Sequence, residues 1–482
     1  MLNLRPVGTI VGLAIAALGV AMLLPMLVDL QSGSPQWRVF LQSALGTVTC
    51  GGLIALTSQS RAAAGLTPRQ SLVLAASGFA VVPLFAAMPF VLGATRLSLL
   101  DAYFEASSGI TTTGATLLTG LGDLPPGLQM WRGILCWSGG LGFVLLALVF
   151  QPQLRSGGLS FFRAATVDMA GHLLPRVVTT ARQLALMYLV ATLLCALCYL
   201  ALGMAPVAAA VAAMATLSTS GITTTDQSFT PLSPGLHLVA VLFMLVASLP
   251  YVRLAQALNR SPGALWRDSQ VRAYLIWLVL ALGLVLAYRL ATIGPAEGAS
   301  LVTALFNLVS VFSGTGFRSG DFWQWGPFVL MVALVLGVVG GCTGSTSSGL
   351  GLFRVLMLRG VIRAQFARIQ SPHRVTPVRY EGRAVSDDVI DQVLVYVGGY
   401  FAALIGFSIL LAMTGVGVGD AVVMIWASLS NIGGFFGAGL APGAVSGDLT
   451  PLAKLVLILA MVTGRLGLAA LFVLASRRFW QV

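Results

Sequence analysis

The sequence contains few charged residues for its length. Of its 482 residues, 9% are Asp, Glu, Lys or Arg, whereas soluble domains contain about 25%. Apolar residues make up 57% of the chain, and runs close to the length of a bilayer span recur throughout it. This composition excludes a soluble globular fold and predicts an all-α polytopic membrane protein.

Residues that commonly bind transition metals or carry out catalysis are also scarce. The three histidines, His172, His237 and His373, are far apart in the sequence and form no metal motif. Cys195 and Cys198 have redox or metal spacing, but no histidine or acid lies near them in their apolar segment, which favours buried free thiols. The sequence therefore predicts no catalytic site, no bound organic cofactor and no enzyme.

The net charge of +12 is not accompanied by a soluble basic domain, so no nucleic-acid partner is expected. The arginines instead gather in connectors between predicted spans, as the positive-inside rule describes for cytoplasmic loops. These connector arginines are Arg155, Arg163, Arg176 and Arg182, then Arg253, Arg260, Arg267 and Arg272, then seven between Arg354 and Arg383. This unequal distribution of arginines between the two sides of the membrane predicts that both termini lie in the cytoplasm.

Apolar segments 7–28 and 39–56 predict a pair of transmembrane helices within an N-terminal unit, residues 1–70. One pattern then occurs four times: a long span, a short helix, a polar loop and a returning span. The four units are predicted at 71–182, 183–270, 271–388 and 389–482. Their short helices are predicted at 100–108, 206–217, 299–311 and 420–429, and their returning spans at 128–150, 236–254, 327–357 and 452–475. Such internal repeats indicate one duplicated unit.

The polar loops can be aligned in two registers. The first two loops share the hexapeptide Ser-Gly-Ile-Thr-Thr-Thr, but distances from the short helices favour another alignment. Asp101 precedes Gly114 by thirteen residues, and Asp420 precedes Gly433 by the same number. The aligned glycines are then Gly114, Gly221, Gly316 and Gly433.

A short helix that ends inside a membrane directs the negative end of its dipole toward the centre. Four such helices and their loop carbonyls, arranged around one axis, can replace the hydration shell of a monovalent cation. Loops 111–116, 218–225, 312–317 and 430–439 contain no carboxylate, which argues against a divalent ion. The predicted ligands are Thr112, Thr113, Gly114, Thr219, Ser220, Gly221, Gly314, Thr315, Gly316, Asn431, Ile432 and Gly433.

These features resemble the superfamily of potassium transporters that includes the Trk, Ktr and HKT proteins, and most closely its bacterial TrkH/TrkG branch. Thr-Thr-Thr-Gly-Ala-Thr at 111–116 is similar to the first family loop, Thr-Gly-Phe at 315–317 to the third, and Asn-Ile-Gly at 431–433 to the fourth. The additional N-terminal spans fit TrkH rather than Ktr. The resemblance covers nearly the whole chain and implies four pseudo-symmetric M1–P–M2 repeats around one pore.

Two further motifs are interpreted through this resemblance. The polar stretch 340–349 interrupts the segment 327–357, which is too long for one span. In the family the matching stretch is an intramembrane gate; a glycine-rich packing face is the alternative. Arg465 resembles a family arginine that lies in the pore below the filter as a barrier to cations, although a snorkelling arginine is the alternative. The implied gate residues are Gly344, Ser345, Thr346 and Arg465.

The sequence departs from the family pattern at three places. The third loop lacks a threonine run, the fourth continues with two phenylalanines after Gly433-Gly434, and Gly467 stands where a glutamate is common. These departures concern selectivity and gating more than the fold.

The resemblance implies potassium uptake across the bacterial inner membrane through a gated, channel-like pore that binds potassium ions. In related plant proteins, serine at the first filter glycine goes with sodium preference, so Gly114 favours potassium. The resemblance also implies a homodimer and a cytoplasmic TrkA-like nucleotide-binding regulatory subunit, for which the stretch 354–383 could be either a docking surface or only a topogenic signal. The alternative is a symporter coupled to protons or sodium, with Asp101 and Glu105 as titratable candidates.

Overall fold

The computed structural model describes residues 3–59, 66–150, 173–259, 263–292, 301–320, 322–371, 377–435 and 449–480. Within these ranges the only strands are β1, Arg379–Tyr380, and β2, Arg383–Ala384, which form one antiparallel hairpin. Everything else of regular structure is helical. Six helical segments are long and apolar enough to cross a membrane, or seven if one bent pair is a single span.

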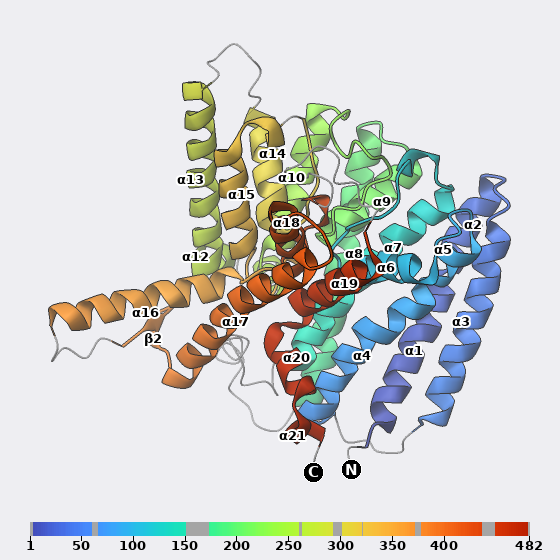
Figure 1. The fold of residues 1–482 in the computed structure, drawn as a ribbon, viewed down its shortest axis with the longest axis horizontal. Coiled ribbons are helices and arrows are strands. Elements are labelled where there is room, and N and C mark those ends of the chain that lie inside the picture. Colours follow the sequence, from blue (N-terminus) through green and yellow to red (C-terminus); the bar gives the residue numbers. More distant parts are fainter. Residues whose placement is uncertain are drawn as a thin grey trace.

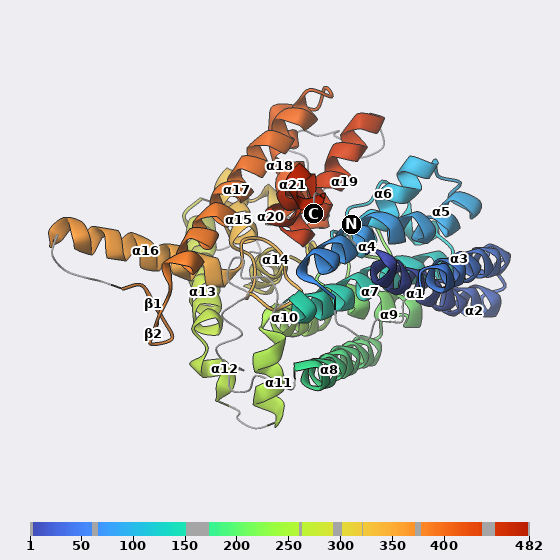
Figure 2. The same cartoon turned by 90° about the horizontal axis from the view of Figure 1, so that it is seen from below.

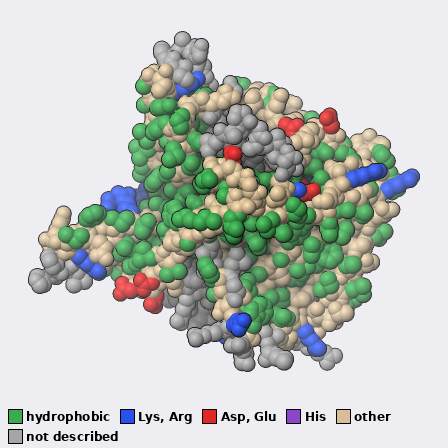
Figure 3. Space-filling model, viewed as in Figure 1, with side chains coloured by type: hydrophobic (Ala, Val, Ile, Leu, Met, Phe, Trp, Pro, Cys, Tyr) green, Lys and Arg blue, Asp and Glu red, His purple; other side chains and the backbone are tan. Residues whose placement is uncertain are grey.

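The surface supports the membrane assignment. Figure 3 shows apolar side chains over much of the visible face, with charged side chains mostly near its margins. Both termini lie at the lower end of Figure 1, so the chain enters and leaves at the same end of the bundle. Of the predicted connector arginines, Arg155, Arg163, Arg260 and Arg374 lie outside the described residues, as do His172 and His373.

The predicted N-terminal helix pair is formed by α1 (Arg5–Ala21) with α2 (Leu23–Gln31), and by α3 (Trp37–Thr57). A Cβ on Gly12 would lie 2.5 Å from the backbone nitrogen of Ala55, so α1 and α3 pack backbone to backbone. The pair packs on the rest of the bundle, and one of its hydrogen bonds there is made by Asp29, whose Oδ1 accepts at 2.7 Å from the Gly127 N–H.

Four short helices occur where the sequence predicts them. They are α6 (Leu99–Ile110), α9 (Pro206–Leu217), α14 (Leu301–Ser313) and α18 (Val418–Leu429). The helices that precede them are α4 (Pro68–Ala86) with α5 (Met88–Leu92), α8 (Leu173–Ala201), α13 (Ser269–Thr292) and α17 (Asp387–Ala412). Those that follow begin at a proline: α7 (Pro126–Phe150), α10 (Pro234–Ser248), α15 (Pro327–Val339) and α19 (Pro451–Leu466).

Three of the four returning helices are interrupted, whereas α7 is continuous. Helix α10 meets α11 (Tyr251–Asn259) with a bend of 103°. A non-helical stretch, residues 340–351, separates α15 from α16 (Leu352–Gln370), and Gly467, at φ +82°, separates α19 from α20 (Leu468–Ala475). Proline or glycine lies at each break, because these residues end or bend helices.

Helix α16 differs from the sequence prediction. The break inside segment 327–357 is confirmed, but the helix after it runs to Gln370 rather than ending near Met357. In Figure 1 it crosses the direction of α13 and α15 and projects from the side of the bundle; Figure 2 shows the same projection from below. Hydropathy reports how apolar a segment is, and it carries no information about the direction that a helix takes after a glycine break.

Candidate functional site

The four short helices end in the same backbone geometry. The residues that follow them in the left-handed region, Thr112, Thr219, Gly314 and Asn431, have φ of +57°, +53°, +81° and +51°. Each donates its N–H to the carbonyl three residues earlier, and the next residue donates to the carbonyl five residues before it. This pair of bonds is the Schellman cap. In every loop the left-handed residue is two positions before the aligned glycine, which supports the alignment made from the sequence.

Two of these left-handed residues are threonines. A β-branched residue at positive φ is a backbone outlier that costs about 1–3 kcal/mol and persists only where its surroundings hold it. Thr219 is held by its Oγ1, which donates to the carbonyl oxygens of Ser218 at 2.7 Å and Thr346 at 3.1 Å. Such strain directs attention to these loops as the functional centre.

The segments 112–114, 219–221, 314–316 and 431–434, here called the ring loops, contact one another in cyclic order. A Cβ on a ring-loop glycine would overlap a carbonyl oxygen of a neighbouring ring loop, in the pairs Gly114–Ser220, Gly221–Thr315, Gly434–Gly316 and Gly433–Thr113. The Gly433 N–H also donates to the Thr113 carbonyl at 2.6 Å. The loops therefore surround one narrow centre, at these positions too narrow for any side chain larger than hydrogen.

Hydrogen bonds behind the ring loops repeat between the first and third units. Ser108 Oγ donates to the Ala115 carbonyl at 2.6 Å, and Ser310 Oγ donates to the Phe317 carbonyl at 2.8 Å. The equivalent serines thus fix the chain just after the aligned glycine. These two bonds hold the loops from behind, on the side of the short helices.

The 340–351 loop packs against the second ring loop and Arg465. Thr346 Oγ1 donates to the carbonyls of Leu217 at 3.0 Å and Ala247 at 3.1 Å. Its carbonyl accepts from Thr219 Oγ1 and, at 2.8 Å, from Arg465 Nη1. Three of the four predicted gate residues also lie in this loop: Gly344, Ser345 and Thr346, of which Ser345 and Thr346 are buried. The structure thus brings a ring loop, the 340–351 loop and Arg465 into one hydrogen-bonded cluster.

Comparison with known proteins identifies the family. The sequence model of TrkH, described as a cation transport protein, matches residues 68–481. This chain belongs to the TrkH family. It is 33% identical to the "Trk system potassium uptake protein TrkI" of Halomonas elongata over 466 residues, which cover 96% of this chain and 94% of TrkI. It is 30% identical to the "Trk system potassium uptake protein TrkH" of Escherichia coli K12 over all of both chains.

A solved structure agrees with the family assignment. The potassium transporter TrkH from Vibrio parahaemolyticus superposes on the whole of this TrkH-family chain, and the whole of its own chain is covered, with a TM-score of 0.90 and 28% identity. The family consists of membrane transporters, so the predictions of a polytopic membrane fold and of a protein that is not an enzyme are confirmed.

Arg465 of this TrkH-family chain is buried, and no carboxylate in the described part of the chain pairs with it. It lies in the last turn of α19, and its guanidinium carbon is 3.9 Å from the centroid of the Phe143 ring. None of the ion pairs among the described residues includes it, and its Nε and Nη2 have no hydrogen-bond partner there. The helix C-terminus and the aromatic face favour a cation at this position. The positive charge is thereby kept next to the 340–351 loop.

The two titratable candidates for symport are both engaged in ion pairs. Glu105 Oε2 is 3.9 Å from Arg132 Nε, and both side chains are 3% exposed. Its Oε1 accepts a hydrogen bond of 2.8 Å from Thr116 Oγ1 and also bonds the Leu117 N–H. Asp101 pairs with Lys454 of α19, the only lysine of the chain. These carboxylates brace the first unit from outside the ring.

Sequence reasoning did not single out Arg132 or Asn307. Arg132 Nη1 donates to the Thr223 carbonyl at 3.2 Å, so it links the first unit to the second. Asn307, like Glu105, lies nine residues before its aligned glycine, and its Oδ1 accepts from the Ser319 N–H at 3.1 Å. Arg132 could have been found, because an arginine inside an apolar span is as unusual as Arg465. Asn307 offered no comparable signal.

Proposed function

We propose that this chain takes up potassium through a gated, channel-like pore whose selectivity filter is formed by the ring loops. The observation that carries the proposal is the fourfold occurrence of one left-handed helix cap, with the loops in contact around one centre. Carbonyls and helix C-terminal dipoles around such a centre stabilise a dehydrated monovalent cation. The two curated relatives reported above are named as Trk system potassium uptake proteins.

The proposed potassium ligands are the residues predicted from the sequence. They are carried by the ring loops and comprise Thr112, Thr113, Gly114, Thr219, Ser220, Gly221, Gly314, Thr315, Gly316, Asn431, Ile432 and Gly433. The 340–351 loop with Gly344, Ser345 and Thr346 acts as the gate, and Arg465 adds an electrostatic barrier beside it. The contacts of Thr346 with Thr219 and Arg465 support this arrangement.

Channel-like conduction is preferred to symport. A coupled transporter normally requires a titratable group in the ion path, whereas Asp101 and Glu105 are held in ion pairs. Reversal potentials measured in potassium gradients at two pH values separate the two mechanisms. Conduction predicts no shift with pH at fixed potassium, and a shift favours proton-coupled symport.

The cellular arrangement is part of the same proposal. Units 71–182, 183–270, 271–388 and 389–482 are four M1–P–M2 repeats that follow the N-terminal pair in 1–70, with both termini in the cytoplasm of a bacterium and the chain in its inner membrane. The connector arginines support this orientation. The protein functions as a homodimer with a cytoplasmic TrkA-like regulatory subunit, as its resemblance to the Trk system suggests.

The filter assignment is tested at Gly114. Its φ of +74° and its contact with the Ser220 carbonyl leave no room for a Cβ, so Gly114→Ser should widen the ring and lower the preference for potassium over sodium. Uptake of both ions is measured in proteoliposomes and in a host that lacks potassium uptake. Gly283→Ser in α13 is the control, because a Cβ there meets open space. Equal ion preference in Gly114→Ser and the control contradicts the assignment.

A further inference from the structure

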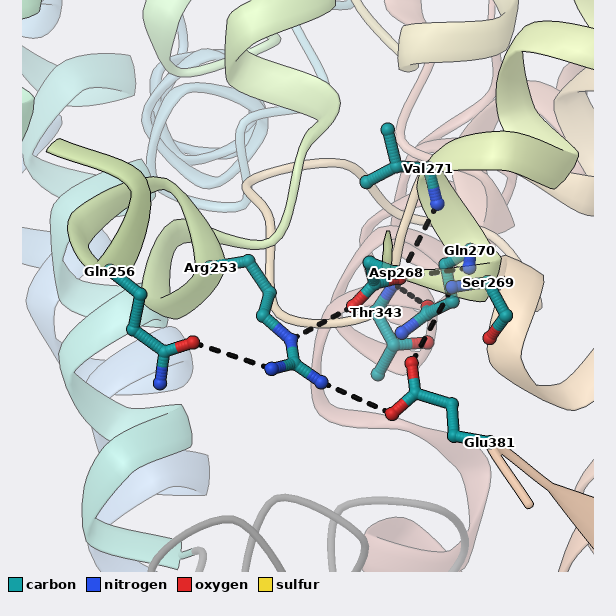
Figure 4. Close-up of polar contacts among 8 residues, drawn as sticks. All are labelled: Arg253, Gln256, Asp268, Ser269, Gln270, Val271, Thr343 and Glu381. Carbon is teal, nitrogen blue, oxygen red and sulfur yellow. Dashed lines mark hydrogen bonds and ion pairs between the residues drawn. The ribbon is translucent and has the colours of Figure 1, made fainter. Parts of the chain in front are cut away.

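Arg253 of α11 joins two acidic residues from separate parts of the chain (Figure 4). Its Nε is 3.0 Å from Asp268 Oδ2, and its Nη2 is 3.1 Å from Glu381 Oε2. Its Nη1 donates to Gln256 Oε1 at 3.3 Å, so all three guanidinium nitrogens are used. Because the planar guanidinium fixes the direction of these bonds, Arg253 holds the two carboxylates in a defined relation.

The two carboxylates also hold the beginning of α13. Asp268 Oδ1 accepts from the Gln270 N–H at 2.8 Å and from the Val271 N–H at 3.4 Å, as an N-cap residue does. Glu381 Oε1 accepts from the Ser269 N–H at 3.4 Å. The first turn of α13 is thus fixed by one residue before the helix and by one residue of the β1–β2 hairpin.

The same elements hold the 340–351 loop. Gln270 Oε1 accepts from the Thr343 N–H at 2.8 Å, and the Tyr251 N–H at the start of α11 donates to the Gly344 carbonyl at 3.0 Å. Next to these two bonds, the Cys342 N–H donates to the Ser248 carbonyl at 3.1 Å. A continuous path of hydrogen bonds therefore leads from Glu381 through Arg253, Asp268 and Gln270 to Thr343 (Figure 4).

The hairpin that carries Glu381 is attached to the helices beyond the loop. Tyr380 packs edge-on against Phe353 of α16, with ring centroids 5.0 Å apart. The two belong to a small apolar cluster with Met357, Val385 and Val393, which joins the hairpin to α16 and α17. The residue before Glu381 is therefore in contact with the apolar cluster that includes α16 and α17.

We propose that Glu381 and Arg253 are positioning residues through which the β1–β2 hairpin holds the 340–351 loop in its place under the ring loops. This inference rests on the proposed function, because it gives that loop its regulatory connection to the exposed hairpin. A chain of hydrogen bonds between two sites can carry energetic coupling, and the Glu381–Thr343 path is such a chain. When Glu381 is released, the first turn of α13 loses one hydrogen-bond acceptor. The 340–351 loop can then move away from the ring loops.

Cys342 reports the position of the loop. It is a free, buried thiol inside the 340–351 loop, whereas Cys136 is a free, buried thiol on α7 outside it. In Glu381→Gln we expect alkylation of Cys342 by N-ethylmaleimide to accelerate about two- to fivefold, the range for loss of a partly exposed ion pair. Peptide mass spectrometry measures both thiols in one sample. Asp388→Asn is the matched control, because it also replaces an exposed acid by a neutral amide, at the start of α17. It should leave the rate of Cys342 alkylation unchanged.

A second variant tests whether the two residues act together. Arg253→Gln should accelerate Cys342 alkylation as well. The alkylation rate of the double variant with Glu381→Gln should be only slightly higher than that of Arg253→Gln, because either substitution alone already breaks the same path. Additive effects overturn the proposed path. Equal acceleration at Cys136 and Cys342 also overturns it, since that result indicates general loosening of the fold.

Potassium uptake separates this inference from the proposed function. In Glu381→Gln the maximal uptake rate should change while the potassium concentration for half-maximal uptake stays constant, because the ring loops are untouched. If the wild type takes up potassium but Glu381→Gln alters neither uptake nor Cys342 alkylation, the inference fails and the proposed function stands. If the wild type takes up no potassium, the proposed function fails whatever the alkylation result.

Discussion

At the scale of single residues, Arg465 carries a buried charge that no acid neutralises within the described part of the chain. Its contacts are the Thr346 carbonyl, the Ser348 hydroxyl and the Phe143 ring. Gly467 takes the position where a glutamate was expected by resemblance, and its φ of +82° allows the helix to break there. The positive charge thus faces the loop rather than a local counter-ion.

Removal of this charge should increase ion flux. We expect Arg465→Ala to raise the rate of potassium uptake, since it removes both the proposed barrier and the hydrogen bond to the Thr346 carbonyl. Arg465→Lys retains the charge but cannot reproduce the planar contacts, so its rate should fall between those of the wild type and Arg465→Ala. Rubidium flux into proteoliposomes gives the rates. An equal or lower rate in well-folded Arg465→Ala argues against the barrier.

At the scale of elements, the first and third short helices are braced by different side chains at equivalent positions. Glu105 in α6 bonds the Leu117 N–H, and Asn307 in α14 bonds the Ser319 N–H. In both cases the N–H lies three residues after the aligned glycine. Glu105 requires Arg132 as a neighbour because an unpaired buried carboxylate is costly, whereas the neutral Asn307 requires no partner charge.

This difference predicts unequal sensitivity to mutation. Arg132→Met should destabilise the protein by about 3–5 kcal/mol, because it leaves the buried Glu105 without a cation. The double variant with Glu105→Gln should recover much of that loss. Thermal unfolding of the purified protein in detergent measures both. If the single variant is as stable as the double variant, the ion pair has no structural role.

The local elements could be predicted because their signals are local. Pro206 marks the beginning of α9, and the polar loop ends it, so the predicted range 206–217 agrees with the structure. The cyclic contacts of the ring loops could be expected only in outline, since they join residues about a hundred positions apart. The path from Glu381 to Thr343 could not be predicted, because an acid in an exposed hairpin carries no periodic or compositional signal of its distant partners.

At the scale of the whole molecule, an ion pair joins the first and last units at their periphery. Asp101 at the start of α6 contacts Lys454 in the first turn of α19, and the Ser98 hydroxyl supports Asp101 at 2.8 Å. The Gly433–Thr113 hydrogen bond joins the same two units at the centre. The cyclic arrangement is therefore closed both at its periphery and at the ring loops.

A double-mutant cycle measures this closure. Both side chains are partly exposed, so we expect Lys454→Met and Asp101→Asn each to lower the free energy of unfolding modestly, with a coupling of about 0.2–1 kcal/mol. The coupling should weaken at high salt, because exposed charges are screened. A coupling of zero at low salt shows that the ion pair adds nothing to the closure.

The unequal continuity of the returning helices has a mechanical consequence. A helix that is broken at proline or glycine can rotate one half while the other half stays in place, as α10 with α11, α15 with α16 and α19 with α20 permit. The unbroken α7 has no such joint and transmits tilt along its whole length. Opening at the lower end of the bundle is therefore expected to be asymmetric, with the first unit as the stationary reference against which the other three move.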